Sequence, residues 1–249
     1  MAPDMERRFG GLARLYGVDG AARIRAAHVA VVGIGGVGSW AVEALARSGV
    51  GALTLVDMDH VVESNVNRQV QAIDDTIGQA KVIAMHGRIT QINPACVVHE
   101  VDQFVERGNW PGLLPHPVDA VIDACDGLTA KAVLSAWALK GQHPFVVVGS
   151  AGGRQHAERV EVADMAEVSH DALITRLRWQ LRRHDGAARG QKLIGIPCVF
   201  SRESEAAPAG AAVHDGTLNC HGFGSSVTVT ATFGLCAAGW VLNRLAAAG

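Results

Sequence analysis

A glycine-rich stretch, VVGIGGVGSW, separates a run of β-branched apolar residues from an apolar segment with helical spacing. Gly33, Gly35 and Gly38 follow the pattern G-x-G-x-x-G, and Gly36 adds a fourth glycine. Glycines in a turn between a strand and a helix let the backbone approach a phosphate, and the helix N-terminus attracts negative charge. The stretch therefore predicts a nucleotide-binding loop, with a tight turn that binds no ligand as the alternative.

Short apolar strands alternate with helical segments through the first half of the chain, a pattern typical of a parallel sheet wound with helices. We expect strands at 28–32, 52–57, 96–101, 118–123 and 144–149. Helices are expected at 37–48, 79–92 and 128–140. The sequence thus predicts an α/β fold whose Rossmann-like parallel sheet carries helices on both faces.

The pattern changes after the turn GSAGG, which begins at Gly149. We expect a half-exposed strand at 158–163, a basic helix at about 171–184, a short strand PCVF and an apolar C-terminal helix. The prediction is a nucleotide-binding region of residues 1–149 and a smaller α+β substrate-binding region of residues 150–249, which can also form one continuous domain.

The uncharged segment 222–242 is about long enough to cross a bilayer. It is rich in Ser, Thr and Gly and has no flanking cluster of Lys or Arg, unlike most membrane spans. Helices that are apolar on all sides also occur in protein cores and at subunit interfaces. We therefore expect a buried helix and no membrane association.

The five cysteines are scattered, and no two of them stand at C-x-x-C spacing. This arrangement is not a disulfide framework and indicates a reducing, cytoplasmic environment. It also lacks the closely spaced thiol pairs of a structural zinc site. Most free cysteines are buried structural residues, which is the interpretation we favour for Cys198 and Cys220.

Charged and polar side chains follow the glycine-rich stretch. Asp57 ends the second expected strand, 19 residues after the last glycine of the stretch, where a carboxylate can bind the ribose of either NAD or ATP. Arg68 and Lys81 then supply cations suited to phosphate oxygens, which a hydride-transfer enzyme does not need. Asn65 and Asn67 are within reach of phosphate or ribose. These residues favour ATP over NAD, and solvated surface cations are the alternative.

Two aspartates follow the fourth expected strand in the sequence VIDACDG. The carboxyl ends of parallel strands meet at one edge of a sheet, where ligands of open α/β sheets bind. Asp126 is therefore predicted to hold a magnesium ion that bridges the triphosphate. Asp123 is expected to cap the following helix instead.

A dense basic segment stands in the second half of a chain whose formal net charge is -2. Only Asp185 opposes its cations, which also include Arg189 and Lys192. Such a segment is typical of contact with a phosphate backbone, and a solvated helix face is the alternative. We hypothesise that four of its residues position a nucleic acid: Arg176, Arg178, Arg182 and Arg183.

Several of these stretches together resemble a known family. VGIGGVGSWAVEALARSGVG, LVDMD, SNVNRQ, GQAKV and VIDACD are similar to motifs of the ubiquitin-activating-enzyme-like superfamily. GSAGG, CVFSRE and VTVTATFG resemble its tRNA threonylcarbamoyladenosine dehydratase branch in particular. The resemblance covers almost the whole chain. It implies a homodimeric enzyme that uses ATP and Mg²⁺ to activate a carboxylate as an acyl-adenylate, with tRNA as substrate and a sulfur-relay protein as a further partner.

Carried over onto this sequence, the resemblance assigns 33–38 to the phosphates of ATP and Asp126 to magnesium. It assigns the other polar residues to ribose or phosphate: Asp57, Asn65, Arg68 and Lys81. The paired zinc cysteines of sulfur-carrier activators are missing, and their N-terminal arginine has no match at Gly11, which leaves Arg8 or Arg14 for its role. By resemblance to thioester-forming relatives, Cys198 and Cys220 are candidates for a nucleophile, and His221 beside Cys220 is a candidate base. An activator of a small sulfur-carrier protein and a non-catalytic NAD-binding regulator remain the alternatives.

The cysteine spacing predicts that the purified protein carries no stoichiometric zinc, because no closely spaced thiol pair is present to bind it. Elemental analysis of protein purified without chelators should give far less than one zinc per chain. A full equivalent of zinc that survives dialysis would contradict this prediction.

Overall fold

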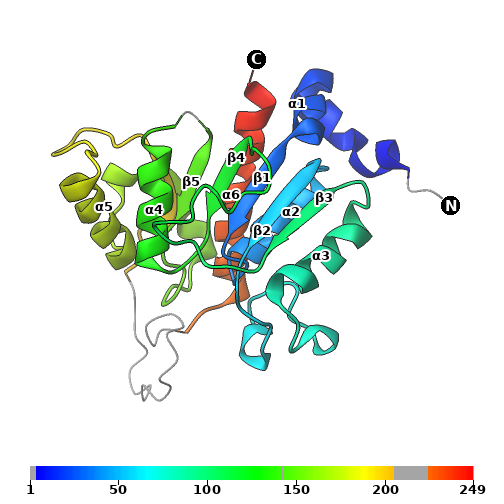
Figure 1. Cartoon of the computed structure of the whole chain (residues 1–249), viewed down its shortest axis with the longest axis horizontal. Helices are drawn as coiled ribbons and strands as arrows, with labels where there is room; N and C mark the ends of the chain where they lie inside the picture. The colour runs from blue at the N-terminus through cyan, green and yellow to red at the C-terminus, as the bar shows by residue number, and fades with distance from the viewer. Residues whose placement is uncertain (1–3, 142, 205–223, 249) are drawn as a thin grey trace.

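A seven-stranded sheet forms the centre of the part of the chain that the structure describes, residues 4–141, 143–204 and 224–248 (Figure 1). The strands of this computed structural model are β1 (His28–Val32), β2 (Ala52–Val56), β3 (Val97–Val101), β4 (Ala120–Asp123), β5 (Phe145–Val148), β6 (Val160–Asp164) and β7 (Pro197–Ser201). Their order across the sheet is β3-β2-β1-β4-β5-β7-β6. Neighbouring strands run parallel except for β6, which is antiparallel to β7 at one edge.

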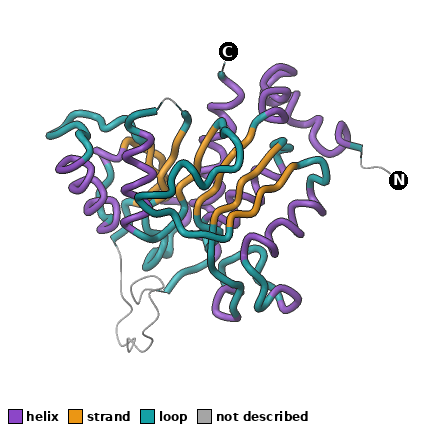
Figure 2. Tube along the Cα trace, in the orientation of Figure 1, coloured by secondary structure: helices purple, strands orange, loops and turns teal. Residues whose placement is uncertain are grey.

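Helices surround this sheet and cover both of its faces (Figure 2). The α-helices are α1 (Met5–Ala26), α2 (Gly38–Arg47), α3 (Lys81–Ile92), α4 (Leu128–Ala138), α5 (Ala172–His184) and α6 (Val227–Ala247). Short 3-10 helices are η1 (Glu63–Asn65), η2 (Asp74–Thr76), η3 (Ala157–Arg159) and η4 (Met165–Glu167). Apolar side chains of α1, α2, α3 and α6 form one core with the sheet, and those of α4 and α5 form a second core on its other face.

Burial on both faces explains why the central strands are apolar throughout. Along β1, Val29 and Val31 belong to the core that includes α2 and α6, whereas Ala30 and Val32 belong to the core that includes α4 and α5. Such strands are typical of parallel sheets with helices on each side. The predicted α/β fold with a Rossmann-like sheet is confirmed, and the expected elements of the first half begin and end within two residues of the observed ones.

Helix α1 was not expected from the sequence. Its four glycines lower helix propensity, and Gly17 interrupts the helix with a φ of 76°. The first turn is capped by Asp4, whose carboxylate accepts a hydrogen bond from the backbone N–H of Arg7 (3.0 Å). Further along, Arg23 Nε donates to the carbonyl of Ala246 (3.1 Å), so that α1 lies beside the C-terminal end of α6 (Figure 1). Tertiary contacts therefore outweigh the poor propensity.

The strands of the second half extend the sheet of the first half. β7 pairs with β5 through Val147 and Cys198, and β6 pairs with β7. The basic helix appears as α5, and Asp171 caps it by accepting a hydrogen bond from the backbone N–H of Ile174 (2.9 Å). Residues near 150 therefore form a connection within a single sheet.

Residues 227–242 of the uncharged segment near the C-terminus lie in helix α6, which buries one of its faces. Its side chains Val229, Phe233, Ala237 and Val241 are fully buried in the core shared with α2. Within the three described ranges, no helix combines the length and the hydrophobicity that a membrane span requires.

A buried ion pair ties α4 to the carboxyl ends of β4 and β5. Lys131 Nζ donates to Asp123 Oδ1 (3.0 Å) and to the carbonyl of Val148 (2.7 Å), and both charged side chains are fully buried. Burial alone would lower the pKa of Lys131, but the attraction of Asp123 raises this pKa above its ordinary value. The expectation that Asp123 caps the following helix is wrong, because the N-cap of α4 is Gly127.

Replacing Lys131 with Met should lower the free energy of unfolding by about 3–5 kcal/mol, because the buried Asp123 carboxylate loses its counter-charge. Lys140→Met is the matched control, since Lys140 is exposed just beyond the same helix, and it should change stability by less than about 0.5 kcal/mol. Urea unfolding followed by circular dichroism measures both variants. Equal free energies of unfolding for Lys131→Met and Lys140→Met would show that the buried Asp123 carboxylate does not need Lys131 as its counter-charge.

Candidate nucleotide-binding site

The glycine-rich loop 33–38 lies where the strand order reverses. β2 and β3 stand on one side of β1, and β4 and β5 stand on the other, which is the position where open α/β sheets bind ligands. Gly33 has a φ of 87°, and a Cβ there would lie 2.7 Å from the amide nitrogen of Cys125. A Cβ at Gly38 would overlap the carbonyl oxygen of Gly33, whereas one at Gly35 would meet no atom within 4 Å. Two glycines are thus required by the fold, and Gly35 faces open space.

Helix α6 and Arg68 pack against this loop. A Cβ at Gly36 would lie 3.2 Å from Cγ of Arg68 and 3.5 Å from the methyl group of Thr230. Gly234 approaches the carbonyl oxygen of Val37 so closely that a Cβ would overlap it. The motif VTVTATFG therefore fixes the loop and the start of α2, whose N-terminus can stabilise an anion.

Asp57 holds the loop from the carboxyl end of β2. Its Oδ2 accepts a hydrogen bond from the amide of Ile34 (2.6 Å), and its Oδ1 accepts one from the amide of Asp59 (2.9 Å). Burial raises the pKa of Asp57, and the positive charge of Lys81 opposes this shift. Since each carboxylate oxygen can accept a further hydrogen bond, Asp57 can hold the loop and bind a hydroxyl group at the same time.

Lys81 begins α3 and pairs with an aspartate that sequence reasoning did not select. Lys81 Nζ lies 2.8 Å from Asp59 Oδ2, and the Lys81 side chain is 8% exposed against 57% for Asp59. The helix dipole disfavours a cation at a helix N-terminus, and Asp59 offsets that cost. The sequence signal that could have identified Asp59 is its position as the second aspartate of LVDMD.

Arg68 lies beside the glycine-rich loop, whereas Asn65 stabilises the turn before it. Arg68 Nη1 donates to Asn67 Oδ1 (3.0 Å), and its backbone carbonyl accepts a hydrogen bond from the Trp40 indole in α2 (2.9 Å). Asn65 is buried, and its Oδ1 accepts a hydrogen bond from the amide of Val62 (3.2 Å). The structure thus brings Arg68 to the loop and engages the Asn65 side chain within its own turn.

Asp126 is accessible at this edge of the sheet, whereas Cys198 is not. Asp126 is exposed in the loop after β4, next to the residue that meets Gly33. Cys198 is fully buried in β7, and burial raises the pKa of its thiol, which makes it a poor nucleophile. Cys220 and His221 lie outside the described residues.

The arginines of α5 fall into two groups. Arg178 Nη1 donates to the carbonyls of Met165 and Val168 (both 2.9 Å) and so holds η4. Arg182 donates to the carbonyls of two residues in the following loop, Ala188 and Gly190 (both 2.9 Å). The other two, Arg176 and Arg183, are exposed.

Two later motifs position the start of α5. The Asp171 carboxylate accepts a hydrogen bond from the amide of Ser150 (2.8 Å), and a Cβ at Gly149 would overlap that carboxylate. Arg154 forms a buried ion pair with Asp171 (3.7 Å). Glu203, from CVFSRE, accepts hydrogen bonds from the two amides that follow Arg154. GSAGG and CVFSRE thus connect α5 to the carboxyl end of β5.

A family model described as the ThiF family matches residues 9–247. The chain belongs to this family. The match spans nearly all of the described residues, from α1 to the end of α6.

Relatives named tRNA threonylcarbamoyladenosine dehydratase are similar over nearly the whole chain. The protein of Escherichia coli (strain K12) is 42% identical over 97% of this chain and 94% of its own, and that of Haemophilus influenzae is 40% identical over 96% and 94%. A solved structure of the E. coli dehydratase in complex with ATP has a TM-score of 0.89 and 41% identity, and the match covers 98% of this chain and 96% of that one. The resemblance found in the sequence is confirmed.

Gly35→Ala should fold like the wild type but weaken ATP binding by about tenfold or more, a loss of about 1.4 kcal/mol, because the added methyl group occupies space in front of the loop. Gly87→Ala, in the exposed face of α3 with no atom within 4 Å of its Cβ, is the matched control and should bind ATP normally. Isothermal titration calorimetry measures both affinities. Unchanged binding by Gly35→Ala would mean that the phosphates do not lie against this loop.

Proposed function

We propose that this protein is an ATP-dependent dehydratase that closes a ring in threonylcarbamoyladenosine of tRNA. The observation that carries the proposal is the likeness, over 97% of the chain, to a protein named for this activity. The glycine-rich loop at the strand-order reversal supports it, because Asp57 and Arg68 contact this loop and the positive charge of Lys81 acts on Asp57. These are groups that a nucleoside triphosphate needs.

In the proposed reaction, the carboxylate of threonylcarbamoyladenosine attacks the α-phosphorus of ATP, and the bond to pyrophosphate breaks. The product is a mixed anhydride of that carboxylate with AMP. A nucleophilic atom of the same modified base then attacks the carbonyl carbon, and AMP leaves with one of the carboxylate oxygens. The base has lost one water, and ATP has become AMP and pyrophosphate.

The chain's own residues act on the phosphates and the ribose in this proposal. Backbone amides of 33–38 and the N-terminus of α2 bind phosphate oxygens. Asp57 accepts a hydrogen bond from a ribose hydroxyl. Arg68 and Lys81 offset the negative charge that grows on pyrophosphate as it leaves, which is where charge stabilisation lowers the barrier most. Asn65 contributes by holding the turn that carries Arg68.

Asp126 is the residue proposed to hold magnesium. It is an exposed carboxylate at the edge of the sheet where the loop lies, and Mg²⁺ is commonly bound by one or two carboxylates together with substrate phosphates. When bound, the ion supplies charge neutralisation for the triphosphate.

We also propose that the protein is a cytoplasmic homodimer. A sulfur-relay protein is proposed as a further partner, and only the resemblance supports it. Nine of the 21 residues of α6 are buried within the chain, so the apolar face of this helix that packs on the core is not available to a dimer. Exposed apolar side chains follow one another in the segment between β2 and α3 and support an interface there: Met58, Val62, Val66, Ile73 and Ile77. Exposed Ile83, in the first turn of α3, follows them.

Lys81→Ala and Arg68→Ala should each fold normally but lower ATP-dependent turnover by about 10²-fold, because each removes a charge from the developing pyrophosphate. Arg25→Ala, an exposed arginine at the end of α1, is the control and should keep full activity. Pyrophosphate release in the presence of modified tRNA measures turnover. Turnover of Lys81→Ala and Arg68→Ala within twofold of the wild type would contradict the assignment.

The direct test is mass spectrometry of tRNA nucleosides after incubation with protein, ATP and Mg²⁺. The expected result is conversion of threonylcarbamoyladenosine to a product lighter by one water, with one AMP formed for each conversion. Unchanged nucleosides, together with AMP transfer to a peptide that ends in Gly-Gly, would instead favour the activation of a sulfur-carrier protein.

A further inference from the structure

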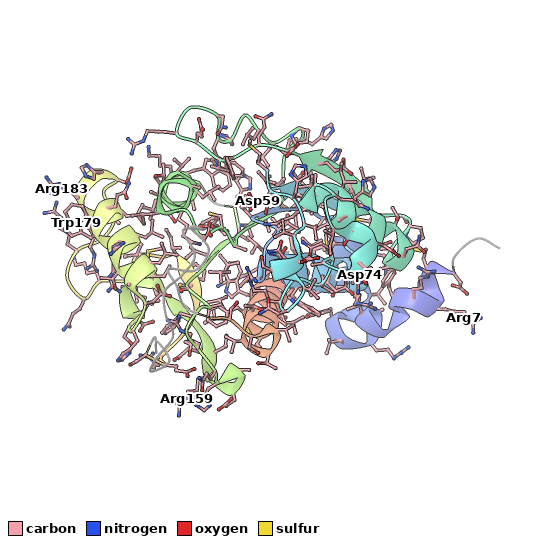
Figure 3. All side chains as sticks on the ribbon, turned by 90° about the horizontal axis from the view of Figure 1, so that it is seen from below. Arg7, Asp59, Asp74, Arg159, Trp179 and Arg183 are labelled. Atoms are coloured by element: carbon pink, nitrogen blue, oxygen red, sulfur yellow. The ribbon has the colours of Figure 1, made fainter. Side chains whose placement is uncertain are left out.

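The outer face of α5 carries an exposed aromatic side chain among cations. Trp179 is 59% exposed, and the Arg183 guanidinium carbon lies 5.0 Å from its ring centroid. The His184 ring lies edge-on at 6.4 Å. Figure 3 shows Trp179 and Arg183 together at the outer edge of this helix, on the far side of the molecule from α1.

The fold does not require this arrangement. The core side of α5 is formed by Ile174, Leu177 and Leu181, which are fully buried. Exposing a tryptophan forgoes the burial of a large apolar surface, which is among the strongest stabilising contributions that a single side chain can make. Trp179 is therefore available to a ligand.

The charges around Trp179 indicate the chemistry of that ligand. Arg176 lies one helical turn before Trp179 and Arg183 one turn after it, and both are exposed. Exposed Arg189 and Lys192 continue the positive charge into the next loop. A planar aromatic ring between cations fits a nucleic acid with unpaired bases, because bases stack on aromatic rings while arginines contact the phosphates.

We propose that Trp179, with Arg183 against its ring, is a stacking platform for an unpaired nucleotide of tRNA beside the modified base. This inference rests on the proposed function, in which a base must be accessible to the adenylation site and its neighbours are therefore unpaired. The Asp171 carboxylate, at the start of α5, accepts a hydrogen bond from the amide of Ser150, two residues beyond the carboxyl end of β5. Trp179 stands eight residues after Asp171, which is about 12 Å along the axis of α5. A few nucleotides of single-stranded RNA are long enough to cover this distance.

The proposal also reassigns the basic helix. Arg178 and Arg182 bind carbonyl oxygens within the protein, so they support the platform as positioning residues. Direct contact with RNA belongs to Arg176, Trp179 and Arg183.

Trp179→Ala should weaken binding of an RNA hairpin with an unpaired loop between about 5-fold and 100-fold, the usual cost of losing one stacked base. Trp179→Phe keeps an aromatic face and should retain most of the affinity. Because tryptophan is uncharged, Trp179→Ala should leave the salt dependence unchanged, whereas Arg183→Glu should reduce its slope by at least about one unit. Fluorescence anisotropy of labelled RNA at several salt concentrations measures these effects.

A second tryptophan–arginine pair provides the matched control. Arg244 lies 5.2 Å from the ring of Trp240 near the C-terminal end of α6. Trp240→Phe and Arg244→Glu should therefore bind the hairpin like the wild type. ATP affinity should be unchanged in all of these variants, which verifies that each one is folded.

Two results would overturn the platform. One is wild-type hairpin affinity in Trp179→Ala, and the other is an equal loss of affinity for the hairpin and for a fully paired duplex of the same stem. Failure of the proposed function looks different: wild-type protein would then not dehydrate tRNA at all, whatever its affinity for the hairpin.

Discussion

The close contact between α6 and the start of α2 is the constraint on which the glycine-rich loop depends. Gly234 leaves no space for a side chain against the carbonyl of Val37, and Thr230 lies against Gly36. On the opposite side, Gly33 meets the backbone that follows β4. The loop is therefore enclosed between two distant parts of the sequence, α6 and the residues that follow β4. A rigid loop of this kind presents its amides to a ligand with little further loss of conformational entropy on binding.

The charges at this edge of the sheet are also fixed in advance by the protein. Lys81 is paired with Asp59, Asp57 is bonded to two amides, and the fully buried Asp123 is neutralised by Lys131. Only Asp59 of these side chains is largely exposed. Charges that are already oriented stabilise a transition state more than charges that must reorganise. The same edge therefore combines a stable fold with the electrostatic conditions for chemistry on phosphates.

Sequence patterns predict the elements of this fold better than they predict the partners of its charges. The strands beside the glycine-rich loop are predictable because continuous β-branched runs have few alternatives in an α/β chain. Helix α1 is not, because its glycines suppress the local signal and its stability comes from contacts with α6, more than 200 residues later. Likewise, no spacing rule separates Arg178, which binds carbonyls of η4, from exposed Arg183. Their roles depend on which backbone groups the fold brings near.

The enclosure of the loop by α6 also has a consequence for how the protein is made. Residues 33–38 leave the ribosome long before residues 227–247 have been translated, although N-terminal segments usually begin to fold first. Until α6 has been made, the start of α2 and the loop lack the contacts of Gly234 and Thr230 on one of their two enclosed sides. A nascent chain can thus contain all seven strands of the described sheet while the glycine-rich loop is still open on the side of α6. Synthesis of the last helix is the step that completes the surroundings of this loop.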